Sequence, residues 1–232
     1  MKYFFILILF FFNTAWAALP TVELEKAHVN IHDKKSIERG AKYFATICMA
    51  CHTMEYMRYD KIAHDAGVVY ERMPVQVTTW PFGVKPPDLS LEINHRGADW
   101  VYTYLHSFYT DPSRPTGVNN LILPNTAMSG ILTSFQGVQI LLPETEWHHS
   151  DFGSGYEWYD LLDLQSHGAM TPEQFDAMVS DVVNFLAYAS NPYQIEQEKM
   201  GVFVLIFLVL FFILAFLLKQ SYWREIKRKQ RK

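Results

Sequence analysis

Two uninterrupted apolar runs lie at opposite ends of the chain. The first covers residues 3–12, after the single positive charge of Lys2, and it leads into an Ala-x-Ala sequence at residues 15–17. A positive residue, a short apolar run and small residues at the end are typical of a cleaved secretory signal. We therefore expect residues 1–17 to be a signal peptide. An uncleaved anchor is the alternative, but the run is short for a hydrocarbon core of about 30 Å.

The second apolar run covers residues 201–218 and contains no charged side chain. At a rise of 1.5 Å per residue, a helix of this length spans about 27 Å, enough to cross a bilayer once. Seven basic residues and one acidic residue follow in the tail at 219–232. Basic residues flank the cytoplasmic end of a membrane helix. We expect an anchor at 200–218, a cytoplasmic tail at 219–232, and no nucleic-acid partner for that tail.

Between the two apolar runs, the pattern of apolar positions predicts three helices. The first covers residues 36–50, with Ser36 as its N-cap. The strongest covers residues 171–189, because Thr171, Pro172 and Gln174 form a capping box with proline at the first helical position. A shorter helix is expected at residues 98–108. The apolar stripe of the first helix consists of Ile37, Ala41, Phe44 and Ile47.

The segments between these helices are rich in proline, glycine and aromatic residues. Residues 80–88 and 111–115 cannot form regular helix, and residues 136–142 and 156–164 predict a small β-hairpin. The fold class is therefore mainly α, with long irregular loops, one small hairpin and one C-terminal transmembrane helix. A domain with so little regular structure needs a further element to organise its core, and a large apolar cofactor would supply it.

The charge distribution narrows the location and the partners. Residues 18–200 contain 12 basic and 23 acidic residues. This exported part is strongly acidic, although the whole chain has a net charge of only −4. An acidic surface keeps a domain soluble and steers basic partners toward it.

The most specific chemical motif is Cys48-Met49-Ala50-Cys51-His52. Cys-x-x-Cys-His is the attachment signature of c-type haem. Two thiols at this spacing reach both vinyl groups of one porphyrin, and His52 follows as the proximal iron ligand. The motif predicts one covalently attached haem c.

Three other interpretations of the cysteine pair compete with haem attachment. The pair can act in thiol–disulfide exchange, form a plain disulfide, or bind zinc. Exchange motifs normally begin a helix, whereas this pair ends one and is followed at once by histidine. The histidines at finger-like spacing, His28 and His32, precede the cysteines instead of following them. Haem attachment is the favoured interpretation.

The distal ligand has to come from elsewhere in the chain. Met54 and Met57 are too near His52 in sequence to reach the opposite porphyrin face. Met128 lies between a proline turn and a glycine, in a loop that can cover a porphyrin, and is the favoured ligand. Met170 or a histidine remains the alternative. Ligation by His and Met leaves no open site and favours electron transfer over oxygen chemistry.

Beyond this motif, residues 31–232 resemble the bacterial type of the cytochrome c1 family, the membrane-anchored haem subunits of the quinol–cytochrome c reductase (bc1) complex. The region at residues 133–165 departs from the mitochondrial pattern. The segments that carry the resemblance are Arg39-Gly40, Lys85-Pro86-Pro87-Asp88-Leu89-Ser90, residues 96–102, Asn125-Thr126-Ala127-Met128, Gly168-Ala169-Met170-Thr171, and the last helix with its anchor.

The resemblance implies a role for each matching residue. It implies that residues 18–199 form an exported monohaem domain. Arg96 has a surface salt bridge as its alternative, because its spacing is one residue shorter than in the mitochondrial pattern. The implied roles are thioethers at Cys48 and Cys51, the proximal ligand at His52, the distal ligand at Met128, packing near the imidazole at Pro87, and a haem-propionate partner at Arg96.

The function implied is a one-electron relay within an enzyme complex. The Rieske iron–sulfur protein would deliver the electron and a soluble or tethered cytochrome c would accept it. The cytochrome b subunit and membrane lipid would surround the anchor, with the haem domain on the periplasmic side of the bacterial inner membrane. The alternatives are a haem subunit of a terminal oxidase, a free membrane-tethered cytochrome c, and an exported thiol–disulfide oxidoreductase.

Overall fold

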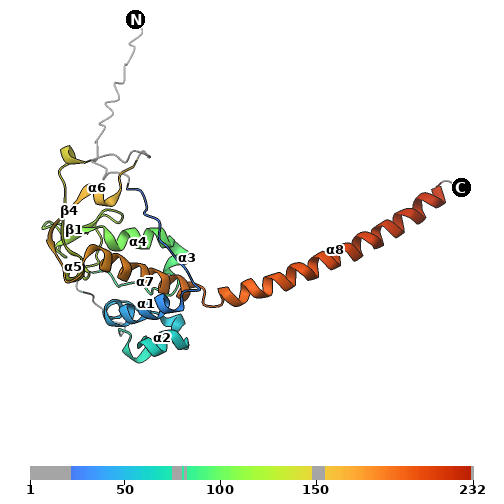
Figure 1. The fold of residues 1–232 in the computed structure, drawn as a ribbon, viewed down its shortest axis with the longest axis horizontal. Helices are drawn as coiled ribbons and strands as arrows, with labels where there is room; N and C mark the ends of the chain where they lie inside the picture. The colour runs from blue at the N-terminus through green and yellow to red at the C-terminus, as the bar shows by residue number, and fades with distance from the viewer. Residues whose placement is uncertain (1–21, 75–79, 81–82, 148–154, 231–232) are drawn as a thin grey trace, which may run out of the picture.

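Two helices from distant parts of the chain lie side by side at the centre of the fold (Figure 1). They are α1 (Lys34–Thr46) and α7 (Pro172–Ser190). The computed structural model describes residues 22–74, 80, 83–147 and 155–230. The predicted signal peptide lies outside the described residues.

Helix α1 begins earlier than its apolar pattern predicts. The N-cap is Asp33, whose side chain accepts a hydrogen bond from the backbone N–H of Ser36 at 3.1 Å. The prediction that Ser36 caps the helix was wrong, because the helix begins at Lys34 and Ser36 is already its third residue, whose N–H the Asp33 side chain accepts. The α-helix ends at Thr46, and a short 3₁₀ turn, η1 (Cys48–Ala50), follows it.

Helix α7 forms as its sequence predicts. Thr171 and Gln174 make the reciprocal hydrogen bonds of a capping box, and the helix ends at Ser190 with Asn191 as its C-cap. Its buried face includes Phe175, Met178, Val179, Val182, Val183, Phe185 and Leu186.

The contact between α1 and α7 combines an ion pair with very close backbone packing. Arg39 donates two hydrogen bonds to the carboxylate of Asp181, at 2.6 and 2.7 Å. At the next residue, a β-carbon placed on Gly40 would lie only 1.9 Å from the carbonyl oxygen of Asp181. One turn further on, the rings of Phe44 and Phe185 pack with centroids 5.8 Å apart. The Arg39-Gly40 pair therefore has a structural cause: one residue binds α7 and the other permits its approach.

Shorter helices complete the body. The predicted helix at 98–108 is confirmed as α4 (Ala98–His106), two residues shorter at its C-terminus. The remaining short elements are η2 (Glu55–Met57), α2 (Lys61–Ala66), η3 (Tyr70–Arg72), α3 (Glu92–Arg96), α5 (Thr133–Gln136), η4 (Glu144–Glu146) and α6 (Trp158–Leu161).

Two antiparallel strand pairs lie beside the helices. β3 (Gly137–Leu141) pairs with β4 (Leu162–His167), so the predicted hairpin exists, with its second strand displaced. The displacement arises because α6 occupies the start of the segment predicted as strand. A second pair, β1 (Phe108–Thr110) with β2 (Val118–Asn120), was not predicted. The mainly helical fold class is confirmed.

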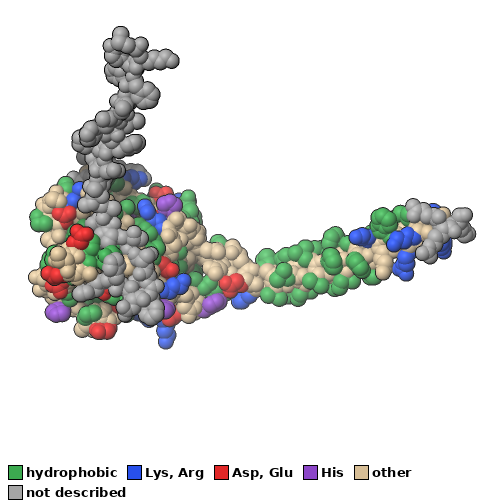
Figure 2. Space-filling model, turned by 90° about the horizontal axis from the view of Figure 1, so that it is seen from above, with side chains coloured by type: hydrophobic (Ala, Val, Ile, Leu, Met, Phe, Trp, Pro, Cys, Tyr) green, Lys and Arg blue, Asp and Glu red, His purple; other side chains and the backbone are tan. Residues whose placement is uncertain are grey.

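Helix α8 (Gln194–Gln230) extends away from the body as a single rod (Figure 1). Among the described residues it is the one helix long and apolar enough to cross a membrane, and none of its apolar window is buried. Figure 2 shows hydrophobic side chains around the rod and basic side chains gathered at its C-terminal end. This arrangement is that of a single-pass anchor attached to a folded domain.

Replacing Gly40 by alanine should destabilise the folded domain. The new methyl group would overlap the backbone of α7, and neither helix can move without losing the Arg39–Asp181 pair. We expect the free energy of unfolding to fall by about 3 kcal/mol or more. Denaturant titration of the detergent-solubilised protein measures the change. Gly201→Ala is the control, because no atom lies within 4 Å of the added carbon; equal effects of the two substitutions would contradict the packing argument.

Candidate functional site

The two cysteines lie in the tight turn that directly follows α1. The carbonyl oxygen of Cys48 accepts hydrogen bonds from the backbone N–H of Cys51 at 3.1 Å and of His52 at 2.9 Å. Both cysteines are free thiols. The turn therefore presents two thiols and an imidazole from one short segment, held in place by the α1–α7 pair.

Burial raises the pKa of the Cys48 thiol to about 12, and the neighbouring Cys51 acts in the same direction. Reactive cysteines in exchange motifs have the opposite property, a lowered pKa that supplies the thiolate nucleophile. The environment of Cys48 therefore disfavours thiol–disulfide exchange. It suits a sulfur that is held covalently and does not titrate.

The side chain of His52 is oriented by a backbone carbonyl. Its Nδ1 lies 2.9 Å from the carbonyl oxygen of Pro87. A carbonyl can only accept, so Nδ1 carries the proton and the lone pair of Nε2 is left for a metal. Burial lowers the pKa of His52, an effect partly offset by the Pro87 hydrogen bond. The neutral form that binds iron is thus the favoured one.

Pro87 belongs to a segment that runs alongside the residues after the motif. The backbone N–H of Leu89 donates to the carbonyl of Thr53 at 3.0 Å, and the Asp88 carboxylate accepts from the hydroxyl of Thr53 at 2.7 Å. Several hydrogen bonds to that carboxylate lower the pKa of Asp88 against the opposing effect of burial, which is the largest single contribution. Sequence reasoning identified Pro87 by resemblance but missed Asp88 and Thr53.

Met128 lies half-buried in a loop held by side chains instead of regular structure. Thr126, in the same loop, accepts a hydrogen bond from the backbone N–H of Met128 at 3.3 Å and shares another with the hydroxyl of Tyr104 at 2.8 Å. The side-chain oxygen of Asn120 accepts from the backbone N–H groups of Ile122 and Leu123. The loop is thereby attached to α4 and β2.

A second set of contacts holds the same loop from its exposed side. Asn125 adopts a left-handed backbone conformation with φ of 64°. Arg114 donates to both the side-chain and backbone oxygens of Asn125, at 2.8 and 3.2 Å. The side-chain oxygen of Asn119 accepts from the backbone N–H of Asn125 at 2.8 Å. The other candidate ligands differ in setting: Met54 and Met57 are fully buried in the core, and Met170 packs partly against it.

The side chain of Arg96 contacts Glu92 and Trp100. Its Nε donates to Glu92 at 3.0 Å, and its guanidinium lies 4.3 Å above the ring of Trp100. Trp100 in turn stacks on Tyr104. The surface ion pair considered from the sequence is thus present, while a role with a haem propionate stays a prediction.

These donors fit a covalently bound porphyrin and its iron. Two free thiols stand at the required spacing, and an imidazole presents Nε2 beside them. Among the described residues, no three His, Cys, Asp or Glu side chains are close enough together to hold a metal ion. A zinc site at the cysteines would therefore lack further ligands within the described chain.

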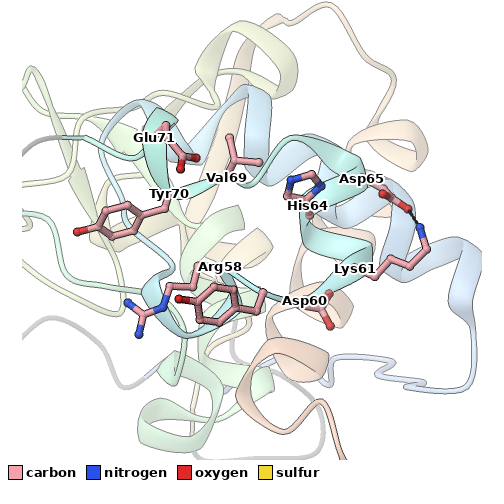
Figure 3. Close-up of a pocket in the computed structure, with 9 residues that line it drawn as sticks. Arg58, Asp60, Lys61, His64, Asp65, Val69, Tyr70 and Glu71 are labelled. Atoms are coloured by element: carbon pink, nitrogen blue, oxygen red, sulfur yellow. Dashed lines mark hydrogen bonds and ion pairs between the residues drawn. The ribbon is translucent and has the colours of Figure 1, made fainter.

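A separate cavity of about 790 Å³ is lined by residues of α2, of η3 and of the segment at 58–60 that precedes α2. Figure 3 shows that charged side chains of both signs surround it, with Lys61 bound to Asp65 at 2.6 Å. It is lined by none of the predicted site residues. Its polar lining does not suit a porphyrin.

Comparison with known proteins gives consistent matches. A family model described as the Cytochrome C1 family matches residues 24–80 and 162–226. Cytochrome c1 of Allochromatium vinosum is 40% identical over 223 residues, which cover 88% of this chain and 89% of that protein. The ammonia monooxygenase gamma subunit of Nitrosomonas europaea is 36% identical with the same coverage. Cytochrome c1 of Rhodospirillum rubrum is 23% identical over 84% of each chain.

Raising the pH from about 10 to about 12 should destabilise the Met128 loop through Tyr104. Burial raises the pKa of Tyr104 to about 12, whereas an unfolded tyrosine ionises near pH 10. Unfolding therefore releases a proton in this window, and stability falls as the pH rises.

Tyr104→Phe lacks this contribution. Between pH 9 and 12, the free energy of unfolding should decrease in both proteins. The decrease in Tyr104→Phe should be about 2–3 kcal/mol smaller than in the parent. Denaturant titrations at the two pH values measure the difference. Tyr59→Phe, which changes a tyrosine that is 90% exposed, should lose as much stability as the parent. A Tyr104→Phe profile that follows the parent would contradict the assignment.

Proposed function

The chain belongs to the cytochrome c1 family, and from that premise we propose that it is the haem-carrying electron-transfer subunit of a bacterial quinol–cytochrome c reductase. Membership of this family implies one covalently attached haem c. The observation that carries the proposal is the arrangement at His52: two free thiols precede it, Pro87 holds its Nδ1, and its Nε2 is left for iron.

Four side chains would hold the cofactor. Cys48 and Cys51 would form the two thioether bonds, and His52, through Nε2, and Met128 would bind the iron. Once bound, the haem supplies a reversible one-electron couple. With His52 and Met128 both bound to the iron, no site would be left for oxygen or another small ligand.

The remaining work of the chain is to keep this geometry constant. The Pro87 carbonyl keeps the proton of His52 on Nδ1. Buried apolar side chains exclude water around the cysteine turn: Phe44 of α1, Phe185 of α7 and Met49 of the turn itself. On the distal side, Tyr104 shares a hydrogen bond with Thr126, and the side-chain oxygen of Asn120 accepts from the backbone N–H of Ile122. Ligands held this firmly move little when the charge of the site changes.

The partners follow from the place of the family in the bc1 complex. We propose that the Rieske iron–sulfur protein delivers the electron, that a soluble or tethered cytochrome c accepts it, and that α8 packs beside the cytochrome b subunit. The chain acts in the enzyme as its electron-transfer subunit. Its acidic exported part would attract a basic acceptor.

The orientation is proposed from charge and the N-terminal signal. The basic residues after the span would lie in the cytoplasm. The haem domain would lie in the periplasm after cleavage of residues 1–17, with α8 in the inner membrane. This orientation places the haem where exported acceptors can reach it.

Copurification tests the proposed assembly. The chain carrying an affinity tag, extracted in a mild detergent, should bring down a cytochrome b and a Rieske protein, and the alkaline pyridine spectrum should show a c-type haem. Because one 36% identical relative is the gamma subunit of an ammonia monooxygenase, the recovered partners decide the assembly. Recovery of oxidase or monooxygenase subunits, with the bc1 partners absent, would overturn the proposal.

Replacing Met128 by leucine should leave the haem attached and lower its reduction potential. The thioethers are untouched, but a thioether ligand that favours the reduced iron is lost. The opened position should also bind carbon monoxide. Redox titration and carbon monoxide difference spectra measure both changes. Met170→Leu is the control and should behave as the parent; the reverse pattern would make Met170 the distal ligand.

A further inference from the structure

The Asp88 carboxylate links two segments that meet at the proximal histidine. Its Oδ2 accepts from the hydroxyl of Thr53 at 2.7 Å and from the backbone N–H of Glu55 at 2.8 Å. Its Oδ1 accepts from the backbone N–H of Ser90 at 2.9 Å. The Asp88 side chain therefore accepts hydrogen bonds from two segments: the residues that follow His52 and the residues that follow Pro87.

Two further contacts strengthen the same junction. The backbone N–H of Tyr56 donates to the hydroxyl of Ser90 at 3.2 Å, and that of Leu89 donates to the carbonyl of Thr53 at 3.0 Å. Ser90 is completely buried. The junction is thus anchored in the interior at one end, while its carboxylate lies at the surface.

The need for such a junction follows from the two prolines. Pro86 and Pro87 have no backbone N–H, so neither can hold its own segment in place by donating a hydrogen bond. The direction of the Pro87 carbonyl therefore depends on the residues that follow. Asp88 is the first of these, and its carboxylate accepts hydrogen bonds from Thr53, Glu55 and Ser90.

We propose that Asp88 is a positioning residue: by holding the Pro87 carbonyl against His52 Nδ1, it sets the strength of that hydrogen bond and, through it, the reduction potential of the haem. The inference rests on the proposed function, because it concerns the haem that His52 would bind. It assigns to Asp88, Thr53 and Ser90 a role in tuning and not merely in folding.

The sign of the effect follows from ligand chemistry. A strong hydrogen bond from Nδ1–H to a carbonyl makes the imidazole more basic at Nε2, and a more basic ligand stabilises oxidised iron. Loosening the junction should therefore raise the potential. Removing the negative charge of Asp88 also raises it, so the test has to separate the hydrogen bonds from the charge.

Thr53→Val makes that separation. It keeps the shape of the side chain and all charges but removes one hydrogen bond to Asp88. In the purified holoprotein, the potential should rise, and the Nδ1–H of His52 should exchange with solvent about tenfold faster, the factor expected for one hydrogen bond to a charged group. Thr53→Ser keeps the hydroxyl and should match the parent in both. Redox titration and NMR of the reduced protein with ¹⁵N-labelled histidine provide the two readouts.

A second comparison uses charge. Asp88→Asn should raise the potential and the exchange rate together. Glu92→Gln removes another carboxylate that acts electrostatically on His52 but receives none of these bonds, so it should leave the exchange rate unchanged. Ser90→Ala removes the hydrogen bond between the Ser90 side chain and Asp88 and should act as Thr53→Val does.

Specific outcomes would overturn the inference. A Thr53→Val protein with the parent's potential and exchange rate would do so, as would equal behaviour of Asp88→Asn and Glu92→Gln in both readouts. A parent protein without covalent haem would instead overturn the proposed function, and the inference with it. Covalent haem in the parent with unaltered variants removes only the role of Asp88.

Discussion

The close packing of α1 on α7 is the constraint on which the site depends. The cysteine turn follows α1 directly, so the position of both thiols is set by how α1 lies on the core. Gly40 permits the approach of the two backbones, and the Arg39–Asp181 pair fixes their relative rotation. A covalent cofactor needs this precision, because two bonds to one rigid ring tolerate little displacement of the sulfur atoms.

Local signals in the sequence predicted the elements that depend on neighbouring residues. The capping box of α7 and the apolar stripe of α1 could be read directly, because both arise from residues within a turn or two of each other. Ser36 was misread as a cap because serine and aspartate are both good N-cap residues, and Asp33, three residues earlier, is the one that caps the helix. The strand pair β1–β2 was missed because each strand is three residues long, too short for a period to appear.

The candidate site divides in the same way. The spacing in Cys-x-x-Cys-His reflects the cofactor's own dimensions, so the motif could be identified without a structure. The partner of His52 could not, because Pro87 lies 35 residues away in a segment without periodicity. Pro87 and Arg96 entered through resemblance alone, whereas Met128 was favoured first from its place in a loop between a proline and a glycine. Asp88 and Thr53 have no local signal beyond an aspartate that follows two prolines, and only the fold brings them together.

The segments on both faces of the proposed haem site are held by polar side chains that accept hydrogen bonds from backbone N–H groups. On the proximal side the Asp88 carboxylate accepts from the N–H groups of Glu55 and Ser90. On the distal side the side chains of Asn119 and Asn120 accept from N–H groups of the Met128 loop. In both places, polar side chains replace the hydrogen bonds that a helix or sheet would supply. Irregular backbone can approach a flat cofactor closely, whereas helices keep their backbones away from it. The long loops of this chain therefore suit the proposed ligands His52 and Met128, because side chains such as Asp88 and Asn120 hold those loops in place.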